Sequence, residues 1–360
     1  MSDSRKFSPL DQEHRDLGGR MVPFAGWEMP VMYCSIIEEH KAVREKCGVF
    51  DISHMGQVFV SGKEAEGWLN SLLTNDVAAL EDGQAHYTFL LNDGGGVIDD
   101  LILYRLTPGH YLLVVNASCI ETDVAWLRKH LRDGIEVVDE SLDWAGMAVQ
   151  GPESPAVFTA LSEGRTLPNR NGVDDLQHEG HRLIICRTGY TGEDGFELFC
   201  PASDGVRWWR RILEERVTPC GLGARDSLRL EMCYPLNGSD LSSGRTPLEA
   251  GLGFFVSLDK GSFIGSEVLR EQKDGGCEER LMALRLKEGG APPRPGYAVV
   301  DESGEVLGEL TSGGISPSMG QGIGLAYLPV GKVKVGSSVS IMVRGKKYPA
   351  QVVKKPFYQK

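Results

Sequence analysis

The sequence predicts an α+β protein in which two related lobes are followed by a small all-β domain. The first half of the chain alternates short apolar strands with amphipathic helices, and the same rhythm resumes near Met147, which indicates two related lobes. After Glu279 the chain changes to short alternating segments separated by turns, which favours a barrel or sandwich of about 80 residues. A length of 360 residues exceeds one small core, so we expect two or three domains.

The composition is that of a soluble globular protein. Hydrophobic residues make up 41% of the chain, and no apolar run approaches the roughly 20 residues of a membrane helix. A net charge of −12 argues against a nucleic-acid partner, because neutralising phosphates requires clustered Lys and Arg. The N-terminal stretch MSDSRKF lacks the apolar core of a secretory signal and the acid-poor character of a transit peptide. We therefore expect a soluble cytoplasmic protein.

The eight cysteines are scattered along the chain and include no CxxC pair. This favours reduced thiols, several of them in the core, over a zinc site or a disulfide framework. No cluster of His, Cys and Asp has the spacing of metal ligands, so we expect the chemistry to need no metal.

The central feature of the chain is the stretch LLNDGGGVIDDLILY at residues 90–104. Residues 87–91 predict one strand and residues 97–104 a second. Residues 92–96 supply the turn, because glycine accepts positive φ and Asn and Asp bond to their own backbone. The pattern therefore predicts a β-hairpin.

Two carboxylates, Asp99 and Asp100, lie side by side inside the apolar second strand. Side chains alternate faces along a strand, so the two should point in opposite directions and have different roles. A buried charge is costly unless it is paired. The residues leave two readings open: both acids hold backbone amides or face solvent near the hairpin, or one serves chemistry in a cleft.

The segment at 21–32, MVPFAGWEMPVM, is broken by Pro and Gly and cannot be one helix, and we expect Phe24 and Trp27 to anchor in a core. Ser35 and Glu38 form a capping box that predicts a helix through residue 47. His54 could be catalytic, but a lone histidine without a fixed partner is more often structural.

Two further helices follow from apolar periodicity. Residues 63–73 carry apolar side chains at 65, 68, 69, 72 and 73, the spacing of one buried helix face. After a strand at 110–115, Ser118 and Glu121 form a second capping box. The buried face of its helix is marked by Ile120, Val124, Leu127 and Leu131.

The second lobe is expected to contain a helix at 155–161 and strands at 183–187 and 196–200. The intervening loop, TGYTGEDG, has three glycines but matches neither nucleotide-binding pattern, and its two acids would repel phosphate. Glu197 follows this loop among apolar neighbours, so it either points to solvent or accepts a ligand's donors.

Helices are expected at 206–213 and 224–232. Arg225 lies near the start of the second of these, where its charge opposes the helix dipole, so it should have a specific acceptor such as Asp226. In the all-β domain the sequence predicts strands at 281–286, 297–300, 306–311 and 339–343.

Eight motifs occur in order along the chain: MVPFAGWEMPV, FDISHM, GGGVIDDLI, VQGP, RTGYTGEDGFE, GLGARDSLRLE, TSGGISPS and KKPFY. Each alone is modest, but the ordered set resembles the aminomethyltransferase, or T-protein, family of the glycine cleavage system from about residue 8 to the C-terminus. The resemblance implies two folate-binding α+β lobes with antiparallel sheets plus a C-terminal β-barrel, in a three-domain cloverleaf around a central hole. The implied ranges are 1–54 with 138–240, 55–137 with 241–279, and 280–360.

The resemblance also implies a reaction. An aminomethyl group carried on the lipoyl arm of the H-protein would pass its one-carbon unit to tetrahydrofolate, with release of ammonia. The family's catalytic acid matches Asp100, and Glu197 and Arg225 match folate contacts. Met55, Tyr87 and Asn116 match positions that line the hole, and Tyr358 matches a C-terminal tyrosine that touches folate in relatives.

Three alternatives remain: two kinds of relative share this fold, which fold alone does not separate, and the third is a non-catalytic protein of a different class. The iron–sulfur-assembly relatives carry a cysteine where this chain has Ser262, within KGSFIG at 260–265, which counts against them. Folate-dependent demethylases differ mainly in pocket residues. In a non-catalytic folate-binding protein, Asp100 would be only a ligand.

Overall fold

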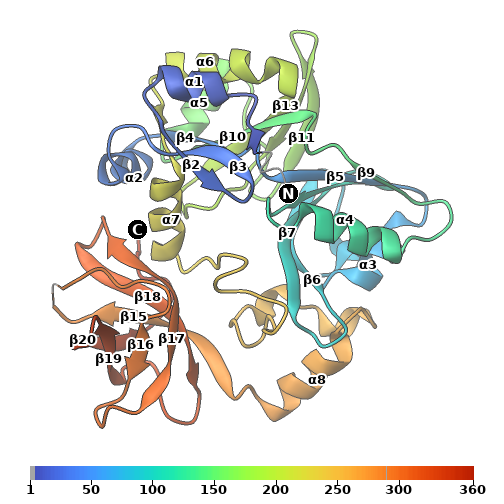
Figure 1. The fold of residues 1–360 in the computed structure, drawn as a ribbon. Helices are drawn as coiled ribbons and strands as arrows, with labels where there is room; N and C mark the ends of the chain where they lie inside the picture. Colours follow the sequence, from blue (N-terminus) through green and yellow to red (C-terminus); the bar gives the residue numbers. More distant parts are fainter. Residues whose placement is uncertain (1–4, 289) are drawn as a thin grey trace. The chain divides into compact units, whose positions relative to one another are not determined.

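The computed structural model describes residues 5–288 and 290–360, and its strands form four sheets (Figure 1). Residues 1–4 of the MSDSRKF stretch lie outside the described residues. The chain divides into two compact units. Unit 1 comprises Met1–Asn70, Val77–Thr88 and Asp100–Asp226, and unit 2 comprises Ser71–Asp76, Phe89–Asp99 and Ser227–Lys360. Within the described part of the chain, no helix has the length and apolar character needed to cross a bilayer.

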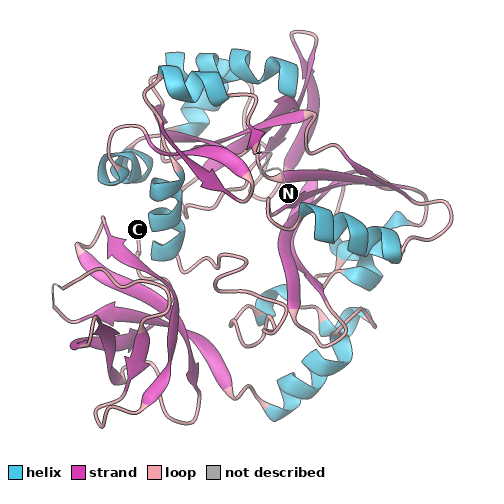
Figure 2. Ribbon diagram, viewed as in Figure 1, coloured by secondary structure: helices cyan, strands magenta, loops and turns pink. Residues whose placement is uncertain are grey.

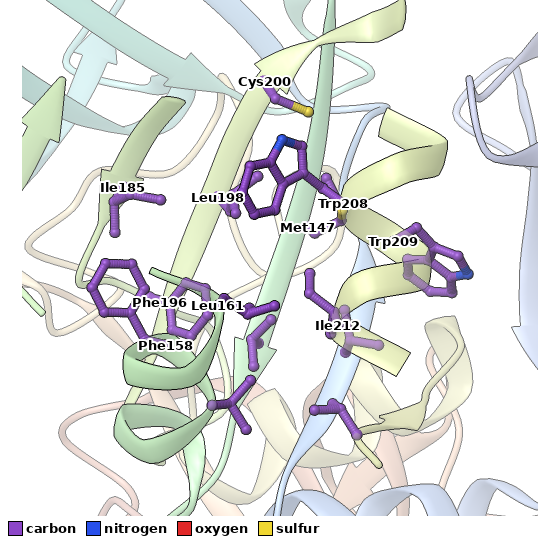
Figure 3. Close-up of a cluster of buried hydrophobic side chains, with 14 of the residues drawn as sticks. Met147, Phe158, Leu161, Ile185, Phe196, Leu198, Cys200, Trp208, Trp209 and Ile212 are labelled. Atoms are coloured by element: carbon purple, nitrogen blue, oxygen red, sulfur yellow. The ribbon is translucent and has the colours of Figure 1, made fainter. Parts of the chain in front are cut away.

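A six-stranded sheet forms the core of unit 1. All neighbouring pairs are antiparallel except β14 with β4. Helices α5 and α6 pack their apolar side chains against it, and Figure 3 shows Trp208 beside Leu198 and Phe158 beside Phe196 of the sheet. In sheet order the strands are β11 (Val173–His178), β12 (His181–Cys186), β13 (Gly195–Pro201), β10 (Trp144–Gln150), β4 (Gly48–Asp51) and β14 (Thr218–Pro219), and the helices are α5 (Ser154–Leu161) and α6 (Gly205–Glu214).

The N-terminal segment forms a three-stranded sheet in the order β1 (Lys6–Phe7), β3 (Trp27–Met32), β2 (Arg20–Phe24), with helix α1 (Asp11–Asp16) between β1 and β2 in sequence. Trp27 on the central strand is 2% exposed, as predicted. The prediction for Phe24 is wrong, because this residue is 36% exposed. It lies at the hairpin end of the edge strand β2, where no further strand covers it.

Helix α2 (Ile36–Glu45) begins where predicted and ends two residues early, but the capping box is absent. Ser35 is the N-cap residue and makes no side-chain cap bond. The buried acid is Glu39 instead, whose Oε1 accepts the amides of Tyr33 at 2.6 Å and Cys34 at 3.1 Å. A carboxylate that already binds several backbone donors fixes the chain entry without a serine cap.

A five-stranded antiparallel sheet has the order β6 (Gln84–Leu91), β7 (Val97–Thr107), β8 (His110–Val115), β5 (Gly56–Ser61) and β9 (Glu136–Asp139). The predicted apolar positions are all buried, four of them in helix α3 (Ala65–Leu72) and Leu73 directly after it. Helix α4 (Ile120–Lys129) buries its predicted face except Leu131, which lies beyond the helix end and is 44% exposed. The second capping box is also wrong, because Cys119 is the N-cap residue and no side chain caps the helix.

The predicted hairpin is formed by β6 and β7, neighbours in this sheet. In its turn, the Asn92 amide donates to the Gly96 carbonyl and the Gly96 amide donates to Asn92 Oδ1. A Cβ on Gly96 would lie 1.9 Å from the Ser243 carbonyl oxygen, so only glycine fits there.

Unit 2 contains a closed barrel with antiparallel neighbours, in the order β15 (Glu279–Leu286), β18 (Gln321–Pro329), β17 (Val306–Ser316), β16 (Ala298–Val300), β19 (Ser338–Val343) and β20 (Lys346–Val353). The four predicted strands are present, whereas β18 and β20 were not predicted. The fold class is therefore confirmed: α+β with antiparallel sheets and a C-terminal β-barrel, as the strands in Figure 2 show. The remaining elements are α7 (Leu222–Glu231), α8 (Ser266–Gly275) and the 3-10 helices η1 (Val77–Ala79), η2 (Ala202–Asp204), η3 (Gly253–Phe255) and η4 (Leu258–Lys260).

Candidate active site

Asp100, on β7, is half-buried and is held by two of the residues that sequence reasoning placed at the site. The Tyr87 hydroxyl donates to Asp100 Oδ2 at 2.7 Å. Asn116 Nδ2 donates to Asp100 Oδ1 at 3.0 Å and to the Asp100 carbonyl at 2.9 Å. Tyr87 comes from β6 and Asn116 follows β8 directly, so the strands on either side of β7 orient this carboxylate.

Asp99 is fully buried, in contrast to its neighbour. Its Oδ1 accepts a hydrogen bond from Asn237 Nδ2 at 2.8 Å, within unit 2. The reading in which both acids hold backbone amides near the hairpin gains no support at Gly96, whose amide donates to Asn92 Oδ1. The two adjacent acids thus have different surroundings and different partners, as strand alternation requires.

Glu197, on β13, does not point to solvent, since it is 6% exposed. Its Oε2 accepts the Thr188 hydroxyl at 2.6 Å and the Tyr104 hydroxyl at 3.4 Å, and these two hydroxyls lie 2.8 Å apart. Burial raises the pKa of Glu197, opposed by these two bonds and by the charge of Arg225. Both of these hydrogen bonds reach Oε2.

Arg225 lies in the first half of α7. Its guanidinium carbon is 4.9 Å from the centre of the Tyr190 ring, a stacking distance. Among the described residues, its buried Nη1 has no hydrogen-bond partner, so the predicted pairing with Asp226 is absent at this atom. Burial lowers the pKa of Arg225, against the opposing charge of Glu197.

Arg229, one turn further along α7, has hydrogen-bond partners on both Nη atoms. It is 3% exposed, and its Nη1 lies 2.7 Å from Asp240 Oδ2, while Nη2 donates to Ser312 Oγ at 2.9 Å. By contrast, Nη1 of Arg225 has no partner in the described part of the chain, so it can donate to an acceptor on a ligand.

His54 and Met55 lie in the same unit. His54 is 2% exposed, and within the described chain its Nδ1 has no partner. Burial lowers the pKa of His54 to about 4, aided by Arg225 and opposed by Asp51, so the ring is neutral at pH 7. The half-buried Met55 is fixed through its carbonyl, which accepts Gln57 Nε2 at 2.7 Å.

Tyr358 belongs to unit 2, whereas Asp100, Glu197 and Arg225 belong to unit 1. It is half-buried, and its amide donates to the Glu231 carbonyl at 3.1 Å, next to the amide of Phe357 at 2.9 Å. The C-terminal tail is therefore tied to the end of α7.

Three residues that contribute contacts to this site are not among the site residues predicted from the sequence: Tyr104, Thr188 and Tyr190. Tyr104 could have been found, because it lies four residues after Asp100 and therefore on the same strand face. Thr188 and Tyr190 lie in the loop before Glu197, and only the folded loop brings them onto Glu197 and Arg225. Among the described residues, no three His, Cys, Asp or Glu gather in a way that would hold a metal ion.

Comparisons with known proteins cover nearly the whole chain. The family model described as the GCVT N-terminal domain matches residues 10–260, and that described as the glycine cleavage T-protein C-terminal barrel domain matches residues 279–359. An aminomethyltransferase of Halalkalibacterium halodurans is 42% identical over an alignment of 361 residues, which covers 99% of this chain and 98% of that protein. An aminomethyltransferase of Bacillus subtilis is 41% identical over an alignment of 362 residues, which covers 99% of each chain.

A solved structure agrees with these relatives. The crystal structure of glycine cleavage system aminomethyltransferase T from Bartonella henselae has a TM-score of 0.93 and 35% sequence identity, and the match covers 99% of this chain and 98% of that one. The chain therefore belongs to the glycine cleavage T-protein family, a family of aminomethyltransferases.

Proposed function

We propose that this chain takes the aminomethyl group from the lipoyl arm of an H-protein, passes its carbon to tetrahydrofolate and releases ammonia. Two bonds of that carbon break, one to the lipoyl sulfur and one to the amino nitrogen. Two nitrogens of tetrahydrofolate supply the new bonds and give up their hydrogens, one to the lipoyl thiolate and one to the leaving amine. The products are methylene-tetrahydrofolate, the dihydrolipoyl arm and ammonia, and no oxidant or reductant is consumed.

The observation that carries the proposal is the donor and acceptor set around Glu197 and Arg225. A pterin presents amino and ring N–H donors, which the Glu197 carboxylate can accept. It also presents a carbonyl, which can accept from Nη1 of Arg225, an atom with no hydrogen-bond partner among the described residues. The Tyr190 ring beneath Arg225 holds the guanidinium plane. The residues present therefore fit a reduced folate.

Asp100 is proposed as the catalytic residue. Positive charge develops on the transferred carbon as its bond to sulfur or nitrogen breaks, and a nearby carboxylate stabilises that charge. Tyr87 and Asn116 bond to different oxygens of Asp100 and so hold its orientation before substrate arrives. They act on the carboxylate, which refines the expectation that they contact folate.

Met55 and Tyr358 remain proposed folate contacts on the family match alone. The three-domain division also remains a proposal. It is supported by the sheets, because every strand of the six-stranded sheet lies within 1–54 or 138–240 and every strand of the five-stranded sheet begins within 55–137.

The decisive experiment measures ammonia release from aminomethylated H-protein with and without tetrahydrofolate. We expect release that rises strongly with tetrahydrofolate and forms methylene-tetrahydrofolate in equal amount. Folate-dependent demethylation of a methylamine or sulfonium donor, with H-protein inert, would replace this proposal with the demethylase reading. Folate binding without turnover of any donor would show a non-catalytic carrier.

A further inference from the structure

We propose that Gln150 is a positioning residue for the Glu197–Arg225 pocket, holding the segment of loop that carries Thr188 and Tyr190. This inference rests on the proposed function, because the pocket is taken to bind a reduced folate. Gln150 is the last residue of β10, in the VQGP motif, and is fully buried. Its side-chain hydrogen bonds reach the Val149 carbonyl and the loop residues Thr188 and Thr191, so we expect it to act on the pocket through the loop.

The side-chain amide of Gln150 binds both ends of the loop segment 188–191. Its Nε2 donates to the Thr188 carbonyl at 3.1 Å. Its Oε1 accepts the Thr191 hydroxyl at 2.9 Å. One buried side chain therefore holds both ends of this segment. The segment carries Thr188, which bonds to Glu197, and Tyr190, which stacks on Arg225.

Two glycines of the loop are shaped around this amide. A Cβ on Gly189 would lie 1.9 Å from Gln150 Oε1, and a Cβ on Gly195 would lie 2.4 Å from Gln150 Nε2. Both distances are far inside van der Waals contact, so neither position tolerates a side chain while Gln150 stays in place. Two of the three glycines in TGYTGEDG are thus needed for close packing against Gln150. This accounts for a glycine-rich loop that matches no phosphate-binding pattern.

A second anchor holds the far half of the same loop. Arg44, on α2, places Nη1 2.7 Å from the Thr191 carbonyl and 2.9 Å from Glu193 Oε1. Both side chains of this ion pair are 5% exposed. The loop therefore begins and ends against buried polar groups, and the pocket contacts lie in the part that Gln150 controls.

The test compares Gln150→Met with wild type. Methionine keeps the length of the side chain and removes both bonds to the loop. Ser162→Ala is the control, since Ser162 is also buried and its hydroxyl bonds to the Phe158 carbonyl, away from the loop. Hydrogen–deuterium exchange of residues 188–195 is measured without ligand, together with the Kd of tetrahydrofolate and the KM and kcat of ammonia release.

In Gln150→Met we expect faster exchange confined to 188–195 and a roughly tenfold weaker Kd and higher KM for tetrahydrofolate. The kcat should stay within about threefold of wild type, because Asp100 is untouched. Ser162→Ala should leave exchange in the loop and the folate Kd unchanged. A folded Gln150→Met variant with wild-type loop exchange and wild-type Kd would overturn the inference.

If Gln150→Met does not fold, Thr191→Val decides. Valine matches threonine in shape and removes the hydroxyl, which donates to Gln150 Oε1 and also accepts the Glu193 amide at 3.2 Å. A smaller change in the same direction is expected, and no change overturns the inference. A wild-type protein that binds no tetrahydrofolate would overturn both the inference and the proposed function. Wild-type binding with unaffected variants would overturn the inference alone.

Discussion

The Tyr87 hydroxyl donates to Asp100 Oδ2 at 2.7 Å, and Asn116 Nδ2 donates to Asp100 Oδ1 at 3.0 Å. The two donors come from opposite sides of β7, so the carboxylate plane is set by the sheet itself. An acid held in this way loses little orientational freedom when substrate arrives. The finding turns two expected pocket-lining residues into supports of the proposed catalytic group.

Tyr87→Phe tests this support. It removes one hydrogen bond to Asp100 and keeps the ring, so we expect kcat for ammonia release to fall by ~10–100-fold with a small change in melting temperature. Tyr111→Phe is the matched control, because in the described structure the buried Tyr111 hydroxyl has no hydrogen-bond partner. Equal kcat values for the two variants would contradict the role of Tyr87.

Arg225→Ala should weaken tetrahydrofolate binding by ~1–3 kcal/mol through loss of a charge-assisted hydrogen bond. Arg225→Lys should recover only part of this, because an ammonium lacks the planar fork that stacks on Tyr190. The measurement is thermal stabilisation as a function of ligand concentration. Arg182→Ala is the control, since Arg182 also stacks on aromatic rings, Phe59 and Trp144, apart from the pocket. Unchanged affinity in both Arg225→Ala and Glu197→Gln would rule out the assigned pocket.

His54 predicts a pH dependence of stability. Its folded pKa is about 4, below the roughly 6.5 of an unfolded chain. Between these values the unfolded chain binds the proton and the folded chain does not, so stability rises with pH through this window. The contribution is fully present above about pH 6.5 and is lost as pH falls to about 4, by up to ~3 kcal/mol.

The measurement is the free energy of unfolding by urea at pH 7.5, 6 and 5 for wild type and His54→Gln. Glutamine does not titrate, so the variant should lose less stability on acidification than wild type. His181→Gln is the control, because His181 is only partly buried and bonds to Asp204. Parallel pH profiles for wild type and His54→Gln would show that His54 does not carry the effect.

The parts of the fold that the sequence predicts correctly rest on local signals. The apolar positions of α3 repeat with helical spacing, and the Asn92–Gly96 turn separates two apolar runs, so both elements follow from near neighbours. The predicted capping boxes at Ser35 and Ser118 are wrong, because other acceptors nearby compete with a serine hydroxyl for the backbone amides at a helix start. At α2 the acceptor is Glu39, which binds backbone amides of the preceding segment.

Strand β18 was missed because its glycines resemble a loop. A Cβ on Gly322 would lie 2.5 Å from Leu286, so this glycine exists for packing inside the barrel, a fact that belongs to tertiary structure. The candidate site divides in the same way. Motif position gives Asp100, Glu197 and Arg225, whereas the Thr188 and Tyr190 contacts arise only when the loop folds over Gln150.

The last prediction separates the two neighbouring acids. Asp100→Asn keeps the shape of the side chain and removes its charge, so turnover should fall by ~10²–10⁴-fold while folding and folate affinity stay nearly intact. Asp99→Asn changes a fully buried acceptor that binds Asn237, so it should lower the free energy of unfolding by ~1–3 kcal/mol with a smaller effect on turnover. The measurement is kcat and melting temperature for both variants side by side. An inactive Asp99→Asn beside a merely unstable Asp100→Asn would move the catalytic role to the other face of β7, and the Tyr87 and Asn116 bonds would then be structural.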